Sequence, residues 1–245
     1  SEGATPPTTP RAATPMIRAL PLPAAIVDLE TTGGRATFDR ITEIGLIEID
    51  EAGVREWSSL VNPGVRIPPI IERLTGITNA MVADAPTFEE LAADLHARLQ
   101  GRLFIAHNVR FDHGFLRNEF QRAGLRFNPQ LLCTVRLSRA LYPHEEKHGL
   151  DALIARHQLV MAERHRALAD ARAVWQFLQA AETELGADTM AGAIARQGKR
   201  ATLPPALDPA VIDALPDTPG VYLFYGDNDA LLYVGKSKNI RTRVL

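Results

Sequence analysis

Short apolar runs dominate the first part of the chain after residue 23, and patterns with helical spacing follow them. Residues 25–29, 41–49 and 54–61 are rich in apolar and β-branched side chains. Such runs predict three strands, and the Gly-containing turn at 50–53 predicts that the second and third form a hairpin. We expect these three strands to be antiparallel neighbours in one sheet.

The chain then alternates between helix-like and strand-like segments. Apolar runs at 102–106 and 131–133 predict two further strands. Thr87, followed three residues later by Glu90, is a capping box that predicts a helix start. Apolar side chains at helical spacing predict helices at 88–101, 112–124, 134–141, 148–154 and 166–185. Strands first, then alternating helices and strands, indicate an α/β domain.

The ends of the chain differ in composition from this domain, which we place at residues 23–186. Residues 1–22 are rich in Pro, Thr and Ala and predict a disordered leader. Residues 187–218 are rich in Ala, Pro and polar side chains and predict a linker. Residues 219–245 contain a second hairpin pattern with a basic end, too short for a core of its own. We interpret this stretch as the truncated start of a second domain.

Composition narrows the class of protein. Apolar residues make up 46% of the 245-residue chain and charged residues 23%, which is typical of soluble globular proteins. No apolar run approaches the length of a membrane span, so we expect no membrane partner. The single cysteine, Cys133, excludes a disulfide framework and a cysteine-based zinc site and favours a cytoplasmic location. A net charge of −2 gives no overall basic field.

The first candidate for chemistry lies where the first strand ends. Asp28 and Glu30 follow an apolar run and are two residues apart, so their side chains point to the same face of a strand. Carboxylates placed together in a poorly solvated position repel one another, and a divalent cation such as Mg²⁺ or Mn²⁺ removes that cost. An isolated pair of this kind is more often a solvated strand end, so the assignment depends on partners elsewhere.

Three residues downstream are suitable partners. Asp112 follows the fourth predicted strand in the first turn of a helix, where a structural role beside the helix dipole is the alternative. Asp170 lies near the apolar face of the last long helix. His165 precedes Asp170 by five residues, so it must lie in the preceding loop or first turn to reach the same site.

This ordered set is similar to the signature of the DEDDh 3′→5′ exonucleases, the family of the proofreading epsilon subunit of bacterial DNA polymerase III. The resemblance spans about residues 22–185. The matching motifs are Asp28-x-Glu30-Thr-Thr-Gly, Asn108-x-x-Phe111-Asp112 and His165-x4-Asp170. It implies a ribonuclease-H-like fold, with a mixed five-stranded sheet flanked by helices, and two Mg²⁺ or Mn²⁺ ions.

The resemblance also implies roles for individual residues. Asp28, Glu30 and Asp170 would hold one ion and Asp28 would contact the second, with Asp112 acting through bound water. His165 matches the general base. The residues expected to face the terminal nucleotide are Leu29, Thr31, His107 and Phe111.

The end of the chain has a resemblance of its own. Gly220-Val221-Tyr222, then Tyr233-Val234-Gly235 and Asn239-Ile240-Arg241, look like the start of a GIY-YIG nuclease domain of the excision-repair incision subunit. Active-site positions would be Tyr222, Tyr233 and Arg241. The printed chain lacks the downstream glutamate of that family, so we do not expect this module to cut DNA.

These patterns favour a metal-dependent 3′→5′ exonuclease acting on single-stranded or frayed DNA 3′ ends, in repair or proofreading, with a polymerase or repair complex as a further partner. The alternatives are an RNA 3′→5′ exonuclease and a non-catalytic nucleic-acid-binding module. The presence of all five matching residues argues against the non-catalytic module.

Overall fold

The protein is described by a computed structural model that covers residues 17–198, 215–216, 218–225 and 230–240. The chain divides into two compact units, residues 1–198 and 199–245, and each is described by itself. The leader up to residue 16, most of the expected linker and Arg241 lie outside the described residues.

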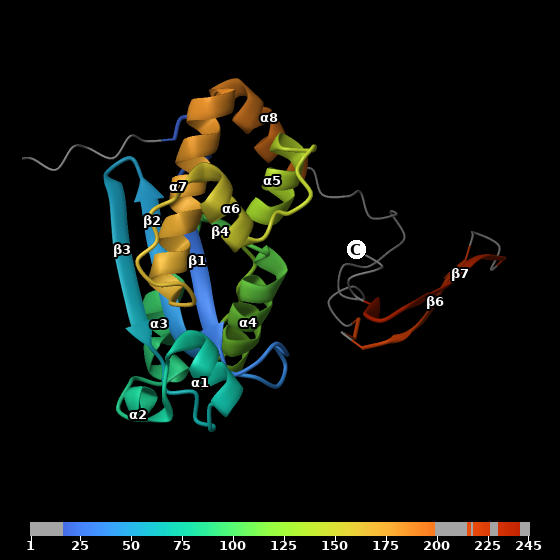
Figure 1. The fold of residues 1–245 in the computed structure, drawn as a ribbon. Coiled ribbons are helices and arrows are strands. Elements are labelled where there is room, and N and C mark those ends of the chain that lie inside the picture. Colours follow the sequence, from blue (N-terminus) through green and yellow to red (C-terminus); the bar gives the residue numbers. More distant parts are fainter. Residues whose placement is uncertain (1–16, 199–214, 217, 226–229, 241–245) are drawn as a thin grey trace, which may run out of the picture. The chain divides into compact units, whose positions relative to one another are not determined.

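The first unit is built on a five-stranded mixed sheet with the strand order β3-β2-β1-β4-β5 (Figure 1). Its strands are β1 (Ala24–Thr31), β2 (Ile41–Asp50), β3 (Gly53–Leu60), β4 (Leu103–Ala106) and β5 (Leu131–Cys133). The first three are antiparallel, whereas β4 and β5 run parallel to β1. The expected antiparallel trio and mixed sheet are confirmed.

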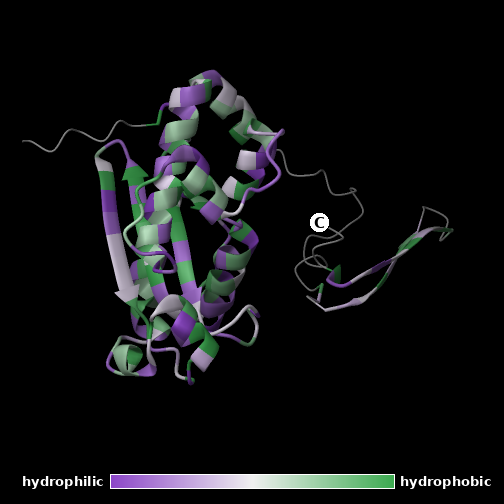
Figure 2. Cartoon of the chain, viewed as in Figure 1, coloured by the Kyte–Doolittle hydropathy of each residue, from purple (hydrophilic) through white to green (hydrophobic). Residues whose placement is uncertain are grey.

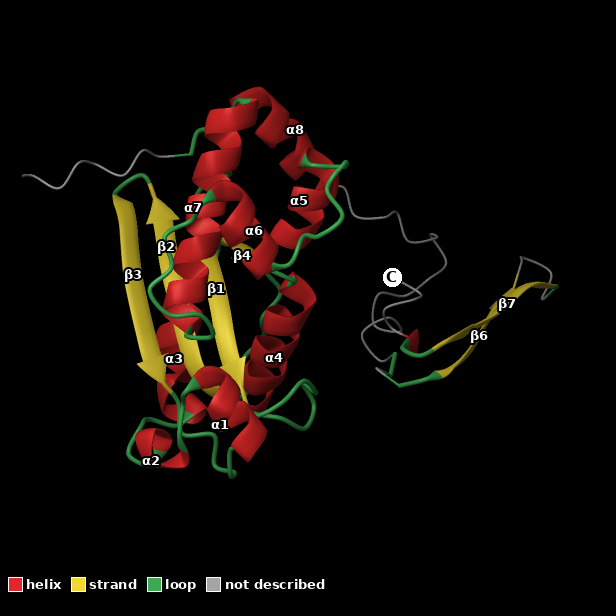
Figure 3. Ribbon diagram, in the orientation of Figure 1, coloured by secondary structure: helices red, strands yellow, loops and turns green. Residues whose placement is uncertain are grey.

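Helices cover this sheet and its ends (Figure 3). They are α1 (Pro69–Thr75), α2 (Asn79–Val82), α3 (Phe88–Leu99), α4 (Val109–Arg122), α5 (Thr134–Leu141), α6 (Leu150–His157), α7 (Ala167–Leu185) and α8 (Ala187–Gly198). The capping box at α3 forms as expected, since the Thr87 hydroxyl accepts from the Glu90 N–H and Glu90 accepts from the Thr87 N–H. In the part of the chain that is described, the helices are too short or too polar to cross a membrane.

The alternation of side chains along β1 divides the core into two layers. Ala24 and Ile26 pack against α7 and its neighbours, whereas Ala25 and Val27 pack against α3 and α4 on the other face. Long hydrophobic stretches in β1 and β2 contrast with the largely hydrophilic edge strand β3 in Figure 2. Asp28 and Glu30 continue the series that faces α7.

Two short helices lie between β3 and α3. Pro69 starts α1 and Gly76 ends it with a left-handed conformation, and the Thr78 side chain then caps α2.

Two boundaries expected from composition are wrong, because residues 17–22 of the predicted leader and 187–198 of the predicted linker belong to the first unit. Ile17 and Leu20 are buried in the core, and the N–H groups of Arg18 and Ala19 donate to the Glu182 carboxylate. At the other end, residues 187–198 form α8, whose Met190, Ala193 and Ile194 are buried at helical spacing. The alanine-rich composition predicts a linker there, but alanine is also the best helix former, and the apolar side chains at helical spacing decide for a helix.

The described part of the second unit contains the expected hairpin. Strands β6 (Gly220–Tyr225) and β7 (Leu231–Ser237) pair antiparallel, with Tyr222 opposite Gly235. A Cβ atom at Gly235 would lie 2.2 Å from the Tyr222 ring, so only glycine allows that ring to lie across the hairpin.

Candidate active site

The candidate site opens where β1 and β4 separate. Their parallel pairing covers Ala24 to Ile26 of β1 and stops before Asp28. A cavity of about 360 Å³ lies at this point and is lined by Asp28, Glu30, Asp112, His165 and Asp170 together with flanking residues. The structure therefore brings together all five residues selected from the sequence.

Asp112 is placed by the end of the parallel pairing. It lies in the first turn of α4, which follows β4, and it is buried. Its Oδ1 accepts a hydrogen bond of 3.1 Å from the backbone N–H of Leu29, the residue between the two β1 carboxylates. Asp112 thus satisfies a strand donor that β4 no longer reaches, and this bond fixes its carboxylate beside the β1 site.

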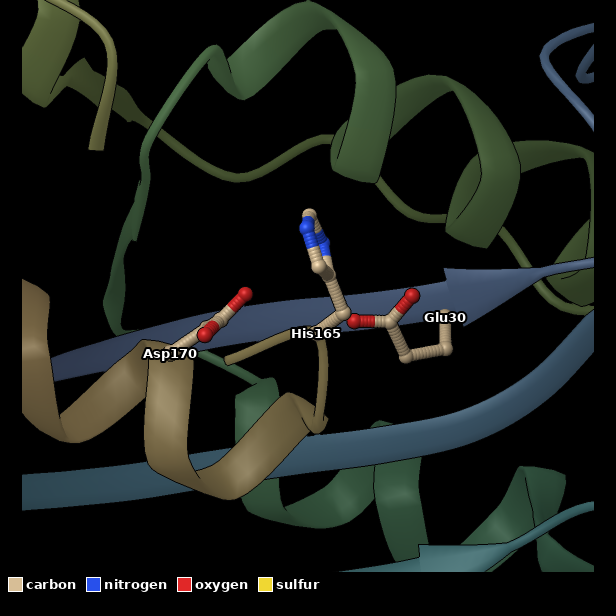
Figure 4. A group of neighbouring side chains, drawn as sticks. All are labelled: Glu30, His165 and Asp170. Atoms are coloured by element: carbon tan, nitrogen blue, oxygen red, sulfur yellow. The ribbon is translucent and has the colours of Figure 1, made fainter. Parts of the chain in front are cut away.

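Asp170 and His165 come from the start of α7. Asp170 is buried in the first turn, and His165 lies in the loop just before the helix with a left-handed φ of 62°. Ligand atoms of Glu30, His165 and Asp170 all lie within 4.8 Å of one another (Figure 4). Placing His165 in the loop lets it share the site with Asp170, as the five-residue spacing requires.

Two residues of β2 set the position of α7. Gly45 pairs with Asp28, and a Cβ atom at Gly45 would lie 2.4 Å from the backbone of Ala167, so the absence of a side chain allows the helix to approach. Glu43 is buried, and its carboxylate accepts from the Ala167 N–H at 2.8 Å and from Arg166 Nε at 2.7 Å. Glu43 therefore supplies from the sheet the cap that α7 lacks locally.

The carboxylates raise one another's pKa. Burial raises the pKa of Asp28 well above its usual value, and the nearby charges of Asp112, Asp170 and Glu30 raise it further. Burial and the charge of Asp170 raise the pKa of Glu30 to about 8. Burial raises the pKa of Asp170 to about 6, while Arg164 opposes that shift. The site holds more negative charge than its surroundings neutralise.

This arrangement fits a divalent cation. Asp170 Oδ1 is buried and has no hydrogen-bond partner among the described residues. Ligand atoms of Glu30, His165 and Asp170 lie together beside two further carboxylates of the cavity, and carboxylate oxygens are the hard donors that suit Mg²⁺ or Mn²⁺. A bound cation would satisfy the orphaned oxygen and remove the repulsion that raises the pKa values.

His165 has the state expected of a base. Burial, followed by the charge of Arg164, lowers the pKa of His165 from its usual value. The imidazole is therefore neutral at pH 7 and able to accept a proton.

The four residues predicted to face a nucleotide, Leu29, Thr31, His107 and Phe111, all line the cavity. His107 is half-buried and both of its ring nitrogens are engaged: Nε2 donates to the His148 carbonyl at 2.9 Å, and Nδ1 lies 2.8 Å from the Thr134 hydroxyl. Burial lowers the pKa of His107 to about 4. His107 thus supports the cavity wall through both of its ring nitrogens.

Sequence reasoning missed three residues of this region: Glu43, Gly45 and Arg164. A glycine and a glutamate inside the apolar run of β2 were the available signal, because both are unfavourable in a buried strand unless another element approaches. Arg164 had no signal beyond its position next to His165.

In the second unit, the structure places Tyr222 and Tyr233 on adjacent strands with ring centroids 5.9 Å apart. Arg241, the third candidate there, lies outside the described residues.

Solved structures with the same architecture identify the class of protein. Exonuclease X, solved in complex with 5′-overhanging duplex DNA, aligns with a TM-score of 0.54 and 28% identity over 70% of this chain and 99% of its own. Exonuclease I aligns with a TM-score of 0.59 and 20% identity over 68% of this chain and 42% of its own. The fold is the ribonuclease-H-like fold of these nucleases.

Sequence comparison then gives the family. The RNase T exonuclease profile matches residues 25–178, and the chain belongs to this exonuclease family. The profile of the UvrC-like GIY-YIG domain matches residues 218–245. The first unit accordingly carries an exonuclease domain, and residues 218–245 resemble a GIY-YIG domain.

Curated relatives share both parts or one of them. A putative bifunctional exonuclease/endonuclease protein of Mycobacterium tuberculosis is 39% identical over 234 residues, which is 89% of this chain and 36% of the relative. The 3′-5′ exonuclease DinG of Staphylococcus haemolyticus is 36% identical over 149 residues, which is 60% of this chain and 17% of the relative. The chain spans only a minor part of the length of either relative.

Proposed function

We propose that this protein is a metal-dependent 3′→5′ exonuclease that releases nucleotides from DNA ends. The observation that carries the proposal is the convergence of Asp28, Glu30, Asp112 and Asp170 with His165 in one cavity. These residues come from β1, α4 and the start of α7, and the protein keeps them together despite their mutual repulsion. A purely structural role would not require four poorly neutralised carboxylates, two of them buried, in one cavity.

The four carboxylates would hold two Mg²⁺ or Mn²⁺ ions. Asp28, Glu30 and Asp170 would hold one ion, Asp28 would also serve the second, and Asp112 would act through bound water. When bound, two such ions supply an activated water and stabilise the charge on the leaving 3′-oxygen. Asp112 keeps its position through the Leu29 N–H, so it orients the β1 backbone as well.

His165 serves as the general base. Its lowered pKa keeps the imidazole neutral, and its place in the loop before α7 directs the ring toward Glu30 and Asp170. The proton of the attacking water passes to this ring during hydrolysis. The cap that Glu43 provides to α7 holds the loop in place during this transfer.

The cavity binds the terminal nucleotide of a strand. The Leu29 backbone and Thr31 face its sugar and phosphate, and Phe111 borders its base. Relatives named for 3′-5′ exonuclease activity and a similar structure solved with duplex DNA support this polarity and DNA as substrate. The match of residues 218–245 to a UvrC-like GIY-YIG domain and the bifunctional exonuclease/endonuclease relative favour a role in DNA repair, within a repair complex.

Degradation of end-labelled strands tests the proposal. Single-stranded DNA and RNA of one sequence, labelled at the 5′ end, are incubated with Mg²⁺, Mn²⁺ or EDTA. We expect a ladder of 5′-labelled DNA products that shortens with time, requires metal and disappears when the 3′ end is blocked by an inverted nucleotide. If RNA is degraded faster than DNA, the preferred substrate is RNA and the DNA part of the proposal is wrong. No cleavage with either metal would overturn the proposal in favour of a binding module.

A further inference from the structure

Arg164 is divided between two carboxylates, one inside the cavity and one outside it. Its Nη1 forms an ion pair with Oδ2 of Asp170, and its Nε contacts Oδ1 of Asp151 at 2.7 Å. The Asp170 side chain is only 4% exposed, whereas that of Asp151 is 78% exposed. Arg164 itself lines the cavity. The guanidinium thus links the buried acidic site to a carboxylate at the solvent edge.

Arg164 acts on more of the site than its direct partner. Its positive charge opposes the raised pKa values of Asp28, Glu30 and Asp170. Since it occupies Oδ2 of Asp170 while Oδ1 is left without a partner, it neutralises the cluster incompletely. The Arg164 guanidinium carries a single charge, whereas full neutralisation of the carboxylates needs divalent ions. A side chain that can move away from Asp170 when such ions bind therefore suits this site.

We propose that Arg164 is a built-in counter-cation of the carboxylate site and competes with divalent metal for Asp170. When the metal is bound, Asp151 keeps the Arg164 guanidinium as its ion-pair partner. This inference rests on the proposed function, because it assumes that Asp170 is a metal ligand. Loading the site requires the Arg164–Asp170 pair to break. Asp151 lowers the cost of that step, since it keeps a partner for the guanidinium outside the cavity.

The two partners of Arg164 have opposite effects on metal affinity. Removing the guanidinium frees Asp170, so Arg164→Gln should bind Mn²⁺ about tenfold more tightly than the wild type. Removing the outer carboxylate leaves the guanidinium to Asp170 alone, so Asp151→Asn should bind Mn²⁺ several-fold more weakly. In the Arg164→Gln background, Asp151→Asn should have no further effect, because its influence passes through Arg164.

The experiment is an equilibrium titration of the metal-free full chain with Mn²⁺, with free Mn²⁺ followed by electron paramagnetic resonance. The matched control is Arg172→Gln on α7, which removes the same charge from a pair with Glu56 that does not line the cavity. It should leave the Mn²⁺ affinity unchanged. Circular dichroism establishes that each variant is folded. If Arg164→Gln is unstable, Asp151→Asn still tests the inference, because Asp151 is exposed and its substitution should not affect folding.

The outcomes are distinguishable. Unchanged or weaker Mn²⁺ binding by folded Arg164→Gln would overturn the inference and leave the proposed function standing. Equal weakening by Asp151→Asn in both backgrounds would also overturn it, because the effect would then be long-range electrostatics. A wild-type protein that binds no Mn²⁺ would overturn the proposed function and this inference together.

Discussion

At the scale of one residue, Glu30 shows how the metal-free site lowers the free energy of unfolding. Its pKa is about 4.5 in an unfolded chain and about 8 in the folded protein. Between these values the folded state binds the additional proton, so the free energy of unfolding falls as the pH rises. Asp28 and Asp170 shift in the same direction and strengthen the trend.

We therefore predict that the protein in EDTA loses stability between about pH 5 and pH 8. Urea unfolding at several pH values measures this slope, and saturating Mg²⁺ should reduce it, because a bound cation removes the repulsion. Stability in EDTA that rises with pH over this range would contradict the electrostatic description of the site.

The sequence predicts some residues of the candidate site and not others. The i, i+2 spacing of Asp28 and Glu30 predicts a shared face, because a strand has a fixed period of two. Glu43 was not predictable in the same way, since its role depends on the position of α7, more than a hundred residues later. Arg164 likewise depends on two partners from different helices.

At the scale of elements, the site depends on how closely α7 approaches β2. Gly45 provides the necessary space, and any side chain there would meet the backbone of Ala167, which cannot move without displacing Asp170. Overpacking of this kind typically costs about 1–3 kcal/mol.

We predict that Gly45→Ala lowers the free energy of unfolding by about 1–3 kcal/mol and reduces nuclease activity further than the loss of folded protein explains. Urea unfolding and steady-state kinetics of the folded fraction measure both effects. Gly192→Ala in α8 is the control, because its Cβ would meet only the end of the Arg196 side chain at 3.6 Å. Equal behaviour of the two variants would contradict the role of close approach.

Elements with strong periodicity were predicted, and those fixed by tertiary contacts were not. The five strands and α3, α4 and α7 follow from apolar spacing and caps in the sequence. Short helices such as α1 and α2 lack an apolar stripe long enough to detect in the sequence. Their capping residues determine where they begin and end. In α8, Gln197 hydrogen-bonds both backbone groups of Cys133, a contact that composition cannot reveal.

At the scale of the whole molecule, every residue of the candidate site belongs to the first unit, residues 1–198. That unit includes α8, which buries Met190, Ala193 and Ile194 in the core beside α7. The boundary at 186 expected from composition would expose this core.

We predict that a chain ending at Gly198 keeps the nuclease activity of the full chain, whereas a chain ending at Gly186 is destabilised by several kcal/mol, since it loses buried apolar side chains. Thermal unfolding and a nuclease assay of the two shortened proteins measure the difference. Equal stability of both would contradict the assignment of α8 to the first unit's core.

The central claim is that Asp28 anchors a metal-dependent hydrolytic site. The rate of nucleotide release from 5′-labelled single-stranded DNA in Mg²⁺, compared between the wild type and Asp28→Asn, tests it most directly. We predict a rate loss of about a thousandfold, because several kcal/mol of transition-state stabilisation depend on the bound ions. Removing one repelling carboxylate should leave the metal-free variant at least as stable as the wild type. A folded Asp28→Asn that retains the wild-type rate would contradict the account.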